Sequence, residues 1–264
     1  MLEREALKVI TLPPPSAIRL TALPILALVI PAHRFSLHWL HALHEQYSLL
    51  CLAHQLPIAW KPVVVLDGLS KADAQLCYDY LEPLQWQVVH LQENLGKGAS
   101  VRAGFRQVVA DYYLFTDDDF PYNAESITAV VHELLQGSDV VFGRRNARYR
   151  RKLPFRRRLL SSALLFFNKR FLRLRHPDTQ CGLKGFSEQG KALLLQTSNN
   201  GFAFDLELAL LARDRIDLRW TAVEVEERGE LDFSDMPVRT LSVEWKNLRE
   251  LLKKSSAKGP KARF

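Results

Sequence analysis

The sequence lacks several features that would assign it to common protein classes. No hydrophobic run approaches the roughly 18 residues that a membrane-spanning helix needs. The first ten residues, MLEREALKVI, include acids where a secretory signal peptide carries only basic residues. The three cysteines, Cys51, Cys77 and Cys181, are widely spaced and form no CxxC pair, which favours reduced thiols over a disulfide framework. We therefore expect a cytoplasmic protein without a membrane span.

Acidic residues are also missing from one long stretch. Between Arg144 and Arg175 the chain has thirteen Lys and Arg residues and no Asp or Glu. This excess is larger than the net charge of +7, so the remainder of the 264-residue chain is mildly acidic. A basic block of this kind favours an anionic partner, such as nucleic acid, a phospholipid surface or a phosphorylated substrate.

Strand-like and helix-like segments alternate along the first half of the chain. Apolar runs predict strands at 25–31, 62–68, 86–92, 112–119 and 138–145, and periodic segments predict helices at 36–56, 71–84, 96–110 and 123–136. The apolar face of the first helix is expected to carry Leu37, Leu40, Leu43 and Leu50. The alternation predicts an α/β fold with a mostly parallel sheet covered on both faces, in one large domain or two small ones.

Three consecutive carboxylates, Asp117 to Asp119, follow the fourth apolar run in DYYLFTDDDFPYN. Adjacent like charges repel by about 1 kcal/mol per close pair in water, so the cluster needs either full solvation or a cation. At the end of a buried strand such carboxylates suit Mg²⁺ or Mn²⁺. The alternatives are a solvated acidic turn and a phosphatase-type nucleophile, although the Thr expected shortly after that nucleophile is missing. Because ligands bind at the carboxyl ends of parallel strands, Asp67, the acidic cluster and Arg144 should share one edge.

Other segments carry weaker signals. The segment NLGKGASVRAGF, residues 94–105, begins a helix with glycines and a lysine, where backbone amides and the helix dipole favour phosphate, although the Walker spacing is absent. His38, His41 and His44 share a helix face, and an exposed face is favoured over a zinc site because no Cys or acidic ligand is in register. Residues 178–186 read as a loop, and Asp205 and Glu207 lie in an apolar helical segment.

Together and in this order, these segments resemble the inverting GT-A glycosyltransferases, most closely the dolichyl- and polyprenyl-phosphate mannosyl- or glucosyltransferases. The similar segments are LVIPAH, VVVLDG, NLGKGASVRAGF, TDDD, DVVFGRR, DTQCGLKGF and FAFDLELALLA, from about Ile25 to Glu227. In TDDD, Asp117 and Asp119 occupy the positions of the DxD metal motif. The resemblance implies a GT-A (Rossmann-like) domain over 25–230, an irregular arm over 1–24, and a C-terminal amphipathic helix and basic tail over 231–264.

The implied reaction is transfer of one sugar of the glucose or mannose class, with inversion, from a UDP- or GDP-sugar to polyprenyl or dolichyl phosphate at the cytoplasmic membrane face. A Mg²⁺ or Mn²⁺ ion held by Asp119, with Asp117 close by, would neutralise the leaving diphosphate. The implied donor residues are Pro31, Ala32 and Asp67 at the base, Asn94, Lys97 and Asp117 on the phosphate side, and Gln180 and Lys184 at the sugar. Arg144 or Arg145 would contact the acceptor phosphate, and Asp178 would be the candidate base for a hydroxyl acceptor.

The same resemblance gives the basic stretch a role. Residues 150–175 interleave basic and apolar side chains and are expected to form an amphipathic segment at an anionic membrane surface. The alternative is a helix packed on the sheet with a solvated basic face. A separate membrane protein is one further partner to consider, whereas nucleic acid is not expected because no recognition motif accompanies the basic residues.

The sequence departs from the resemblance where the base and ribose would bind. Arg34 and Phe35 replace the Asn-Glu that follows the first strand, Leu66 replaces the first acid of the second motif, and Leu69 replaces its Ser. Two alternatives therefore stay open. One is a GT-A enzyme with a soluble or different lipid acceptor, and the other is a catalytically silent membrane-surface or partner-binding module.

Overall fold

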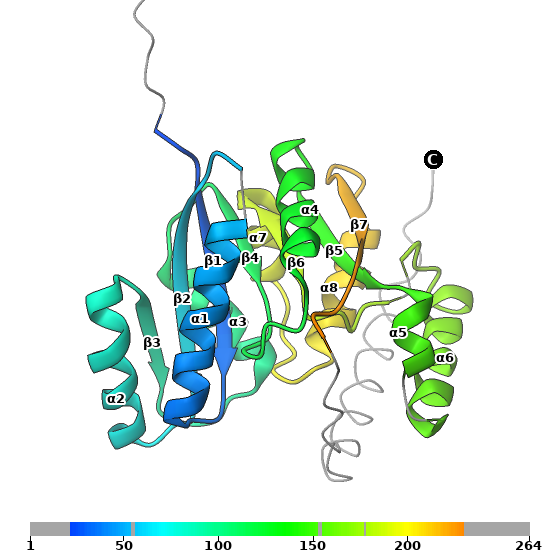
Figure 1. Ribbon diagram of the computed structural model, residues 1–264. Coiled ribbons are helices and arrows are strands. Elements are labelled where there is room, and N and C mark those ends of the chain that lie inside the picture. Colours follow the sequence, from blue (N-terminus) through cyan, green and yellow to red (C-terminus); the bar gives the residue numbers. More distant parts are fainter. Residues whose placement is uncertain (1–21, 54–55, 153–154, 177, 230–264) are drawn as a thin grey trace, which may run out of the picture.

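The computed structural model describes residues 22–53, 56–152, 155–176 and 178–229. Within them a seven-stranded sheet has the order β3-β2-β1-β4-β6-β5-β7 (Figure 1). The strands are β1 Ile25–Ala32, β2 Ala59–Asp67, β3 Gln87–Leu91, β4 Tyr112–Phe115, β5 Val140–Arg145, β6 Lys184–Ser187 and β7 Trp220–Val225. Neighbouring strands are parallel except at β6, which is antiparallel to both β4 and β5. The mostly parallel α/β sheet expected from the sequence is confirmed.

Helices cover both faces of this sheet, and the apolar side chains of β1 pack against both layers of helices. Leu26, Leu28 and Ile30 belong to one buried cluster with residues of α1, α2 and α4, while Ala27 and Val29 belong to a second cluster with residues of α3, α7 and α8. The helices are α1 Leu37–Ala53, α2 Lys71–Leu81, α3 Lys97–Gln107, α4 Ala124–Leu135, α5 Ala147–Lys152, α6 Phe155–Arg170, α7 Glu188–Leu194 and α8 Phe204–Arg213, with a 3₁₀ turn η1 Glu82–Leu84. β1 is thus an interior strand that is buried on both faces.

Side-chain caps define where several helices begin. The Asn123 carboxamide oxygen accepts a hydrogen bond from the Ser126 amide at 3.0 Å and starts α4 directly after the acidic loop. Ser70 caps α2 in the same way through the Asp73 amide at 3.1 Å. Such caps satisfy amides that would otherwise lack a partner. The α4 cap thereby sets the length of the loop that carries the carboxylates.

Strands β2, β4 and β5 run in the same direction, so their carboxyl ends meet at one edge of the sheet. Asp67 ends β2, the acidic cluster follows β4, and Arg144 lies at the end of β5. The expectation that these residues share one edge is therefore confirmed.

One expected core residue is misplaced. Leu37 is 59% exposed, whereas Leu40, Leu43 and Leu50 are buried as expected. Leu37 is the first residue of α1, and a side chain in the first turn points back toward the helix start, beyond the sheet that buries the later turns.

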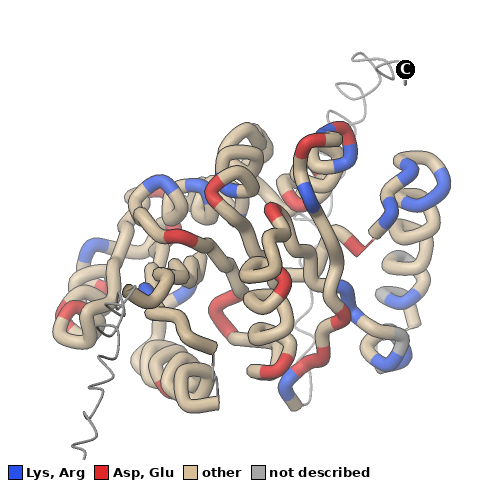
Figure 2. The backbone as a smooth tube through the Cα atoms, turned by 90° about the horizontal axis from the view of Figure 1, so that it is seen from above, with Lys and Arg blue, Asp and Glu red and all other residues tan. Residues whose placement is uncertain are grey.

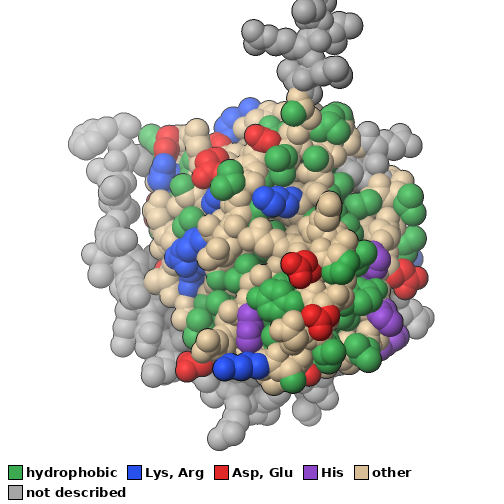
Figure 3. Space-filling model, turned by 90° about the vertical axis from the view of Figure 1, so that its left-hand side faces the viewer, with side chains coloured by type: hydrophobic (Ala, Val, Ile, Leu, Met, Phe, Trp, Pro, Cys, Tyr) green, Lys and Arg blue, Asp and Glu red, His purple; other side chains and the backbone are tan. Residues whose placement is uncertain are grey.

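The basic stretch forms α5 and α6, which lie together at one end of the molecule beyond β5 and β7 (Figure 1). Viewed from above, this end carries Lys and Arg without the Asp and Glu that are interspersed elsewhere (Figure 2). The opposite side, near α2 and β3, mixes acidic, basic, histidine and hydrophobic side chains (Figure 3). In the part of the chain that the structure describes, no helix combines the length and hydrophobicity needed to cross a bilayer.

Two expected terminal segments lie largely or wholly outside the described residues. Of the arm expected over 1–24, only residues 22–24 are described, and they form no helix or strand. The amphipathic helix and basic tail expected over 231–264 fall entirely outside.

Candidate active site

The acidic loop, residues 117–122, connects β4 to α4 at the carboxyl edge of the sheet. Asp117 and Asp118 are half-buried and Asp119 is exposed. The loop turns tightly, with the Phe120 amide donating to the Asp117 carbonyl oxygen at 3.1 Å and Phe120 at a φ of 46°. A non-glycine residue in the left-handed region is uncommon and persists only where its surroundings hold it.

The three carboxylates share one nearby ammonium group. Lys97, at the first position of α3, forms an ion pair with Asp117. Burial alone would lower the pKa of Lys97, but Asp117 and Asp205 raise it above its ordinary value. Desolvation, together with repulsion from Asp119 and Asp117, raises the pKa of Asp118 to about 7. Desolvation and Asp117 also raise the pKa of Asp119. The loop therefore gathers more carboxyl groups than its local cations balance, and a bound cation would favour their ionised forms.

This excess charge fits a divalent cation whose ligands are completed by a substrate. Among the described residues, no group of three or more His, Cys, Asp or Glu side chains is arranged to hold a metal ion, and this includes the histidines of α1. Mg²⁺ commonly takes only one or two protein carboxylates and completes its shell with phosphate oxygens and water. Asp119, exposed and without the lysine partner that Asp117 has, is the carboxylate best suited to that role.

Asp67 does not present a free carboxylate to a ligand. It is buried, and its two oxygens accept hydrogen bonds from the amides of Leu95 at 2.7 Å and Gly96 at 2.9 Å. Both oxygens hold the loop that precedes α3, and the expected contact of Asp67 with a nucleotide base stays a prediction. Asn94, in the same loop, is exposed.

Two backbone amides at the start of α3 already have a hydrogen-bond partner. The amides of Gly98 and Ala99 both donate to the carbonyl oxygen of Asn200, at 2.7 and 3.4 Å. A Cβ at Gly96 would lie 2.6 Å from the same oxygen, so this glycine allows the close approach of the 197–203 loop. Two amides of this helix start thus already have a carbonyl partner, phosphate binding by the amides stays a prediction, and the Lys97 ammonium is the charged group here.

A buried arginine secures that loop. Arg102 of α3 donates to the Thr197 hydroxyl at 3.0 Å, to the Asn199 carbonyl oxygen at 2.8 Å, and to the Asn200 side chain. Glu207 of α8 accepts from the amide of Asn199 at 2.8 Å. The 197–203 loop is thus fixed from two helices and covers the first turn of α3.

On the β5 side, Arg145 and Asp178 form a bidentate ion pair. The Asp178 carboxylate accepts from Nη2 and Nε of Arg145, at 2.6 and 3.0 Å, and from the Arg145 amide at 2.8 Å. Although burial opposes it, Asp178 raises the pKa of Arg145 well above its ordinary value. Asp178 is therefore not free to act as the general base expected for a hydroxyl acceptor, since both of its oxygens are occupied.

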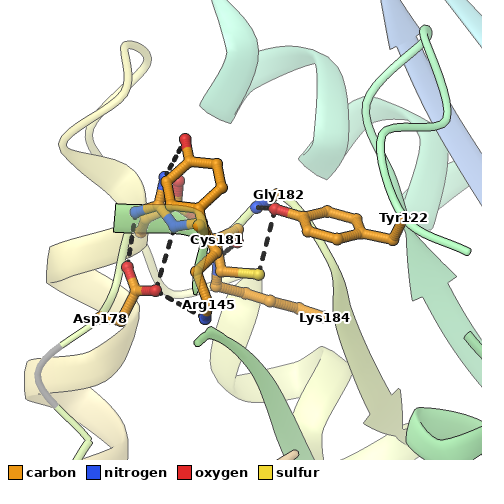
Figure 4. A network of polar contacts seen from close by, with 8 residues as sticks. Tyr122, Arg145, Asp178, Cys181, Gly182 and Lys184 are labelled. Atoms are coloured by element: carbon orange, nitrogen blue, oxygen red, sulfur yellow. Dashed lines mark hydrogen bonds and ion pairs between the residues drawn. The ribbon is translucent and has the colours of Figure 1, made fainter. Parts of the chain in front are cut away.

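Arg145 and Arg144 differ in surroundings. Nη1 of Arg145 donates to the Tyr149 hydroxyl at 3.2 Å, and the guanidinium lies over the Tyr149 ring. Arg144 is exposed and lies 3.3 Å from Glu224. Of the two arginines expected at an acceptor phosphate, Arg145 is the one built into the polar network beside the acidic loop (Figure 4).

Lys184 lies beneath the site rather than in it. It is completely buried and donates to the Asp205 carboxylate at 2.7 Å and to the Cys181 carbonyl oxygen at 2.6 Å. The expectation that Lys184 lines a sugar pocket does not fit this burial. Its ammonium instead supports the segment 178–184 from below, while the half-buried Gln180 remains nearer the surface.

The base side of the expected site lacks the acid and the hydroxyl that the resemblance implies. Pro31 and Ala32, at the end of β1, pair in register with Val65 and Leu66. Leu66 and Leu69, which stand at the positions of the expected acid and hydroxyl, are both buried apolar side chains.

Sequence reasoning missed the residues that hold the acidic loop in place. Tyr122 lies in the turn-rich segment DDDFPYN, where its type gave no indication of a buried hydrogen-bonding role. Arg228 follows β7, and its guanidinium donates to the carbonyl oxygens of Asp119 at 3.2 Å and Phe120 at 3.3 Å. No local pattern connects residues more than 100 positions apart in the sequence.

A comparison with known proteins defines the class. The chain resembles the solved structure of mannosyl-3-phosphoglycerate synthase from Rubrobacter xylanophilus, with a TM-score of 0.65 and 16% identity over 91% of this chain and 77% of that one. It also resembles glucosyl-3-phosphoglycerate synthase from Mycobacterium tuberculosis, solved with Mn²⁺, UDP and phosphoglyceric acid, with a TM-score of 0.56 and 17% identity over 88% of this chain and 78% of that one. These likenesses show the fold, which is the GT-A fold of glycosyltransferases.

Residues 46–195 match the family described as Glycosyl transferase family 2. The match includes more than half of the chain, and the chain belongs to this family. The resemblance to GT-A glycosyltransferases inferred from the sequence motifs is thus confirmed.

Relatives within the family point to the lipid-phosphate branch. The chain is 26% identical over 223 residues to dolichyl-phosphate beta-glucosyltransferase of Saccharomyces cerevisiae, covering 73% of this chain and 64% of that protein. It is 24% identical over 171 residues to undecaprenyl-phosphate 4-deoxy-4-formamido-L-arabinose transferase of Pectobacterium carotovorum, covering 64% of this chain and 51% of that protein. The chain thus spans about half to two thirds of the length of these curated relatives.

Proposed function

We propose that the chain transfers one sugar of the glucose or mannose class, with inversion, from a nucleotide-sugar to a polyprenyl or dolichyl phosphate at the cytoplasmic face of a membrane. The observation that carries this proposal is the meeting of Lys97, the acidic loop and Arg145 at one sheet edge of a family 2 domain. The names of the relatives, which act on dolichyl and undecaprenyl phosphates, support the acceptor class.

The donor side follows from charge. A leaving nucleoside diphosphate is anionic, and the Lys97 ammonium is the cation beside the loop that would face it. A divalent ion, Mg²⁺ or Mn²⁺, bound by Asp119 with Asp117 close by would supply Lewis-acid neutralisation of the diphosphate. Asp117 is already paired with Lys97, so its role is to orient that ammonium as much as to bind a cation. Pro31, Ala32 and Gln180 are proposed to line the nucleotide and sugar.

The acceptor side needs little proton chemistry. A lipid phosphate is ionised at neutral pH, so its oxygen can attack the anomeric carbon directly. A new carbon–oxygen bond forms on one face of the sugar while the bond to the diphosphate breaks on the other, and its electron pair leaves with the diphosphate oxygen. Arg145, held by Asp178 and stacked on Tyr149, would bind the acceptor phosphate, with Arg144 further out. The engagement of Asp178 by Arg145 agrees with a reaction that requires no general base.

The basic end of the molecule suits a membrane surface. Helix α6 exposes Phe155, Leu159 and Phe166, each between 63% and 69%, and Phe171 just after it is 62% exposed. Arg158, Lys169 and Arg170 are exposed on the same helix. Exposed aromatic and aliphatic groups among basic residues favour binding to anionic lipid headgroups. We therefore propose that α6 brings the sheet edge to the lipid acceptor.

The test is a calorimetric titration of UDP and GDP, each with and without Mn²⁺, on the wild type and on Asp119→Ala. Manganese-dependent binding of one nucleotide, lost in the variant, supports an enzyme and identifies the donor base. Binding of neither nucleotide would favour the silent surface module, because Leu66 and Leu69 replace the acid and the hydroxyl expected at the base.

A transfer assay separates the two kinds of acceptor. Each candidate UDP- or GDP-sugar is offered with undecaprenyl phosphate in vesicles and, separately, with 3-phosphoglycerate in solution. Release of nucleoside diphosphate only with the lipid supports the proposal. Release only with the soluble phosphate would refute the lipid acceptor while retaining the enzyme.

A further inference from the structure

The acidic loop is held by contacts from outside its own segment. Phe120 is buried with a φ of 46°, a conformation that a bulky side chain rarely adopts. At the end of the loop, the Pro121 carbonyl oxygen accepts a hydrogen bond from the Arg228 amide at 2.9 Å, and Tyr122 forms an isolated antiparallel bridge with Glu227. A strained turn of this kind requires such surroundings to persist.

Tyr122 makes the contact that reaches across to the other half of the sheet. Its side chain is only 6% exposed, and its hydroxyl oxygen accepts hydrogen bonds from the Gly182 amide at 3.1 Å and from the Cys181 thiol at 3.2 Å (Figure 4). Residues 181 and 182 belong to the segment that leads into β6. The phenol therefore ties the end of the acidic loop to a segment about 60 positions later in the chain.

The backbone of Gly182 in turn contacts the first carboxylate of the loop. A Cβ built at Gly182 would overlap Oδ2 of Asp117, so the glycine backbone lies directly against that oxygen. The other oxygen, Oδ1, pairs with Lys97. The Asp117 carboxylate thus lies between the Gly182 backbone and the Lys97 ammonium group. The hydrogen bond from the Gly182 amide to Tyr122 holds that backbone in position.

We infer that Tyr122 is a positioning residue for the acidic loop. Its phenol oxygen holds Gly182 against Asp117, which keeps that carboxylate on Lys97 and leaves Asp119 exposed for a cation. The effect on cation binding rests on the proposed function, whereas the effect on the loop itself does not. The role passes through Gly182 and requires no contact between Tyr122 and a substrate.

The experiment compares Tyr122→Phe, Gly182→Ala and the double variant with the wild type. The matched control is Tyr113→Phe, which also removes a buried phenol oxygen, one that pairs with Glu188 and Lys191 away from the acidic loop. Mn²⁺ affinity is measured by calorimetry without nucleotide, hydrogen–deuterium exchange is followed over 114–122 and 180–184, and thermal unfolding reports the stability of each variant.

The expected loss of Mn²⁺ affinity is about tenfold in Tyr122→Phe, the size typical of groups that support a metal ligand without touching the metal. Gly182→Ala should lose at least as much, and adding Tyr122→Phe to it should cost little more, because both changes act on one contact. The exchange of the acidic loop should accelerate in Tyr122→Phe and stay as in the wild type in Tyr113→Phe, even where the two variants unfold at similar temperatures.

Three results would overturn the inference or part of its basis. Wild-type Mn²⁺ affinity and wild-type loop exchange in Tyr122→Phe would remove the positioning role. Fully additive losses in the double variant would show that Tyr122 does not act through Gly182. If the wild type binds no Mn²⁺, the cation role in the proposed function fails, and the exchange comparison alone decides whether Tyr122 holds the loop.

Discussion

Replacing Lys184 by Met is expected to destabilise the protein strongly. Lys184 is completely buried, its ammonium lies 2.7 Å from the buried Asp205 carboxylate, and the rings of Phe115 and Phe142 lie within 6.0 Å of it. Methionine fills a similar volume but leaves the Asp205 charge buried beside apolar rings. Breaking a buried pair in this way costs about 3–5 kcal/mol. For a chain of this size, that loss corresponds to a fall in the thermal midpoint of roughly 10 °C.

The loss should depend on pH with a defined sign. Burial raises the pKa of Asp205 in the folded protein, and Lys184 and Lys97 only partly offset it. A carboxyl whose folded pKa is raised contributes its full stability below its unfolded pKa of about 4, and the contribution is lost as pH rises through the folded pKa. Removing Lys184 raises that folded pKa further. The deficit of the variant should therefore be largest near pH 8 and shrink toward pH 5, by up to about 1.4 kcal/mol per pH unit.

Urea denaturation of the wild type and of Lys184→Met at pH 5 and pH 8 gives the free energy of unfolding directly. The control is Lys191→Met, since Lys191 is also largely buried but its carboxylate partner, Glu188, is exposed to solvent and can remain charged. It should lose about 1–2 kcal/mol, with no recovery at pH 5. A deficit for Lys184→Met below about 1 kcal/mol, or one equal at both pH values, would refute the reasoning.

Three further predictions concern the helix start, the acceptor side and the membrane surface. Gly98→Ala should destabilise by about 1–3 kcal/mol in thermal unfolding, because the added methyl would overlap the carbonyl oxygen of Asn199. Arg145→Lys keeps the charge but loses the bidentate pairing, and we expect kcat/KM for the lipid acceptor to fall by about 10–100-fold with nucleotide affinity unchanged. Replacing Phe155 and Phe166 by Ser should reduce flotation with anionic vesicles several-fold.

Each of these predictions has a control or a contrary outcome. Ile216 is fully exposed outside α6, so Ile216→Ser should leave vesicle flotation unchanged. Equal loss in that variant would mean that general surface hydrophobicity, not α6, determines binding. A parallel fall in nucleotide affinity in Arg145→Lys would place that arginine on the donor side. Wild-type stability in Gly98→Ala would show that the 197–203 loop can move away from α3.

The sequence was sufficient for the elements whose signals are local. The apolar runs and periodic segments predicted β1 to β5 and α1 to α4, because side-chain periodicity and turn residues are properties of neighbouring positions. Strand β6 was not predicted, and residues 178–186 were read as a loop, because Lys184–Ser187 is only four residues long. Its antiparallel pairing with β4 and β5 is decided by distant strands.

In the candidate site, too, local signals were predicted from the sequence and distant contacts were not. The acidic cluster and Lys97 were found from residue type and spacing, and the structure brings them into contact. Asp67 was expected to face a ligand because it ends a predicted strand, and Lys184 because the resemblance to glycosyltransferases implied it. The partners of Asp67 are backbone amides of the loop between β3 and α3, and the partner of Lys184 is the buried Asp205. Neither partner can be predicted from the flanking residues. Charge alone does not distinguish a ligand contact from internal support.

The distant contacts of the carboxyl edge set the smallest fragment that can be studied in isolation. The family match covers residues 46–195, but the central strand β1 precedes it. Three supporting residues follow the match. Asn200 accepts hydrogen bonds from the amides at the start of α3, Asp205 pairs with Lys184, and Arg228 donates to the carbonyl oxygens of the acidic loop. A truncated version cut at the match would keep the acidic motif and lose its scaffold. Expression libraries and chimeric enzymes made from this chain should therefore exchange the block from residue 25 to residue 229 as one unit.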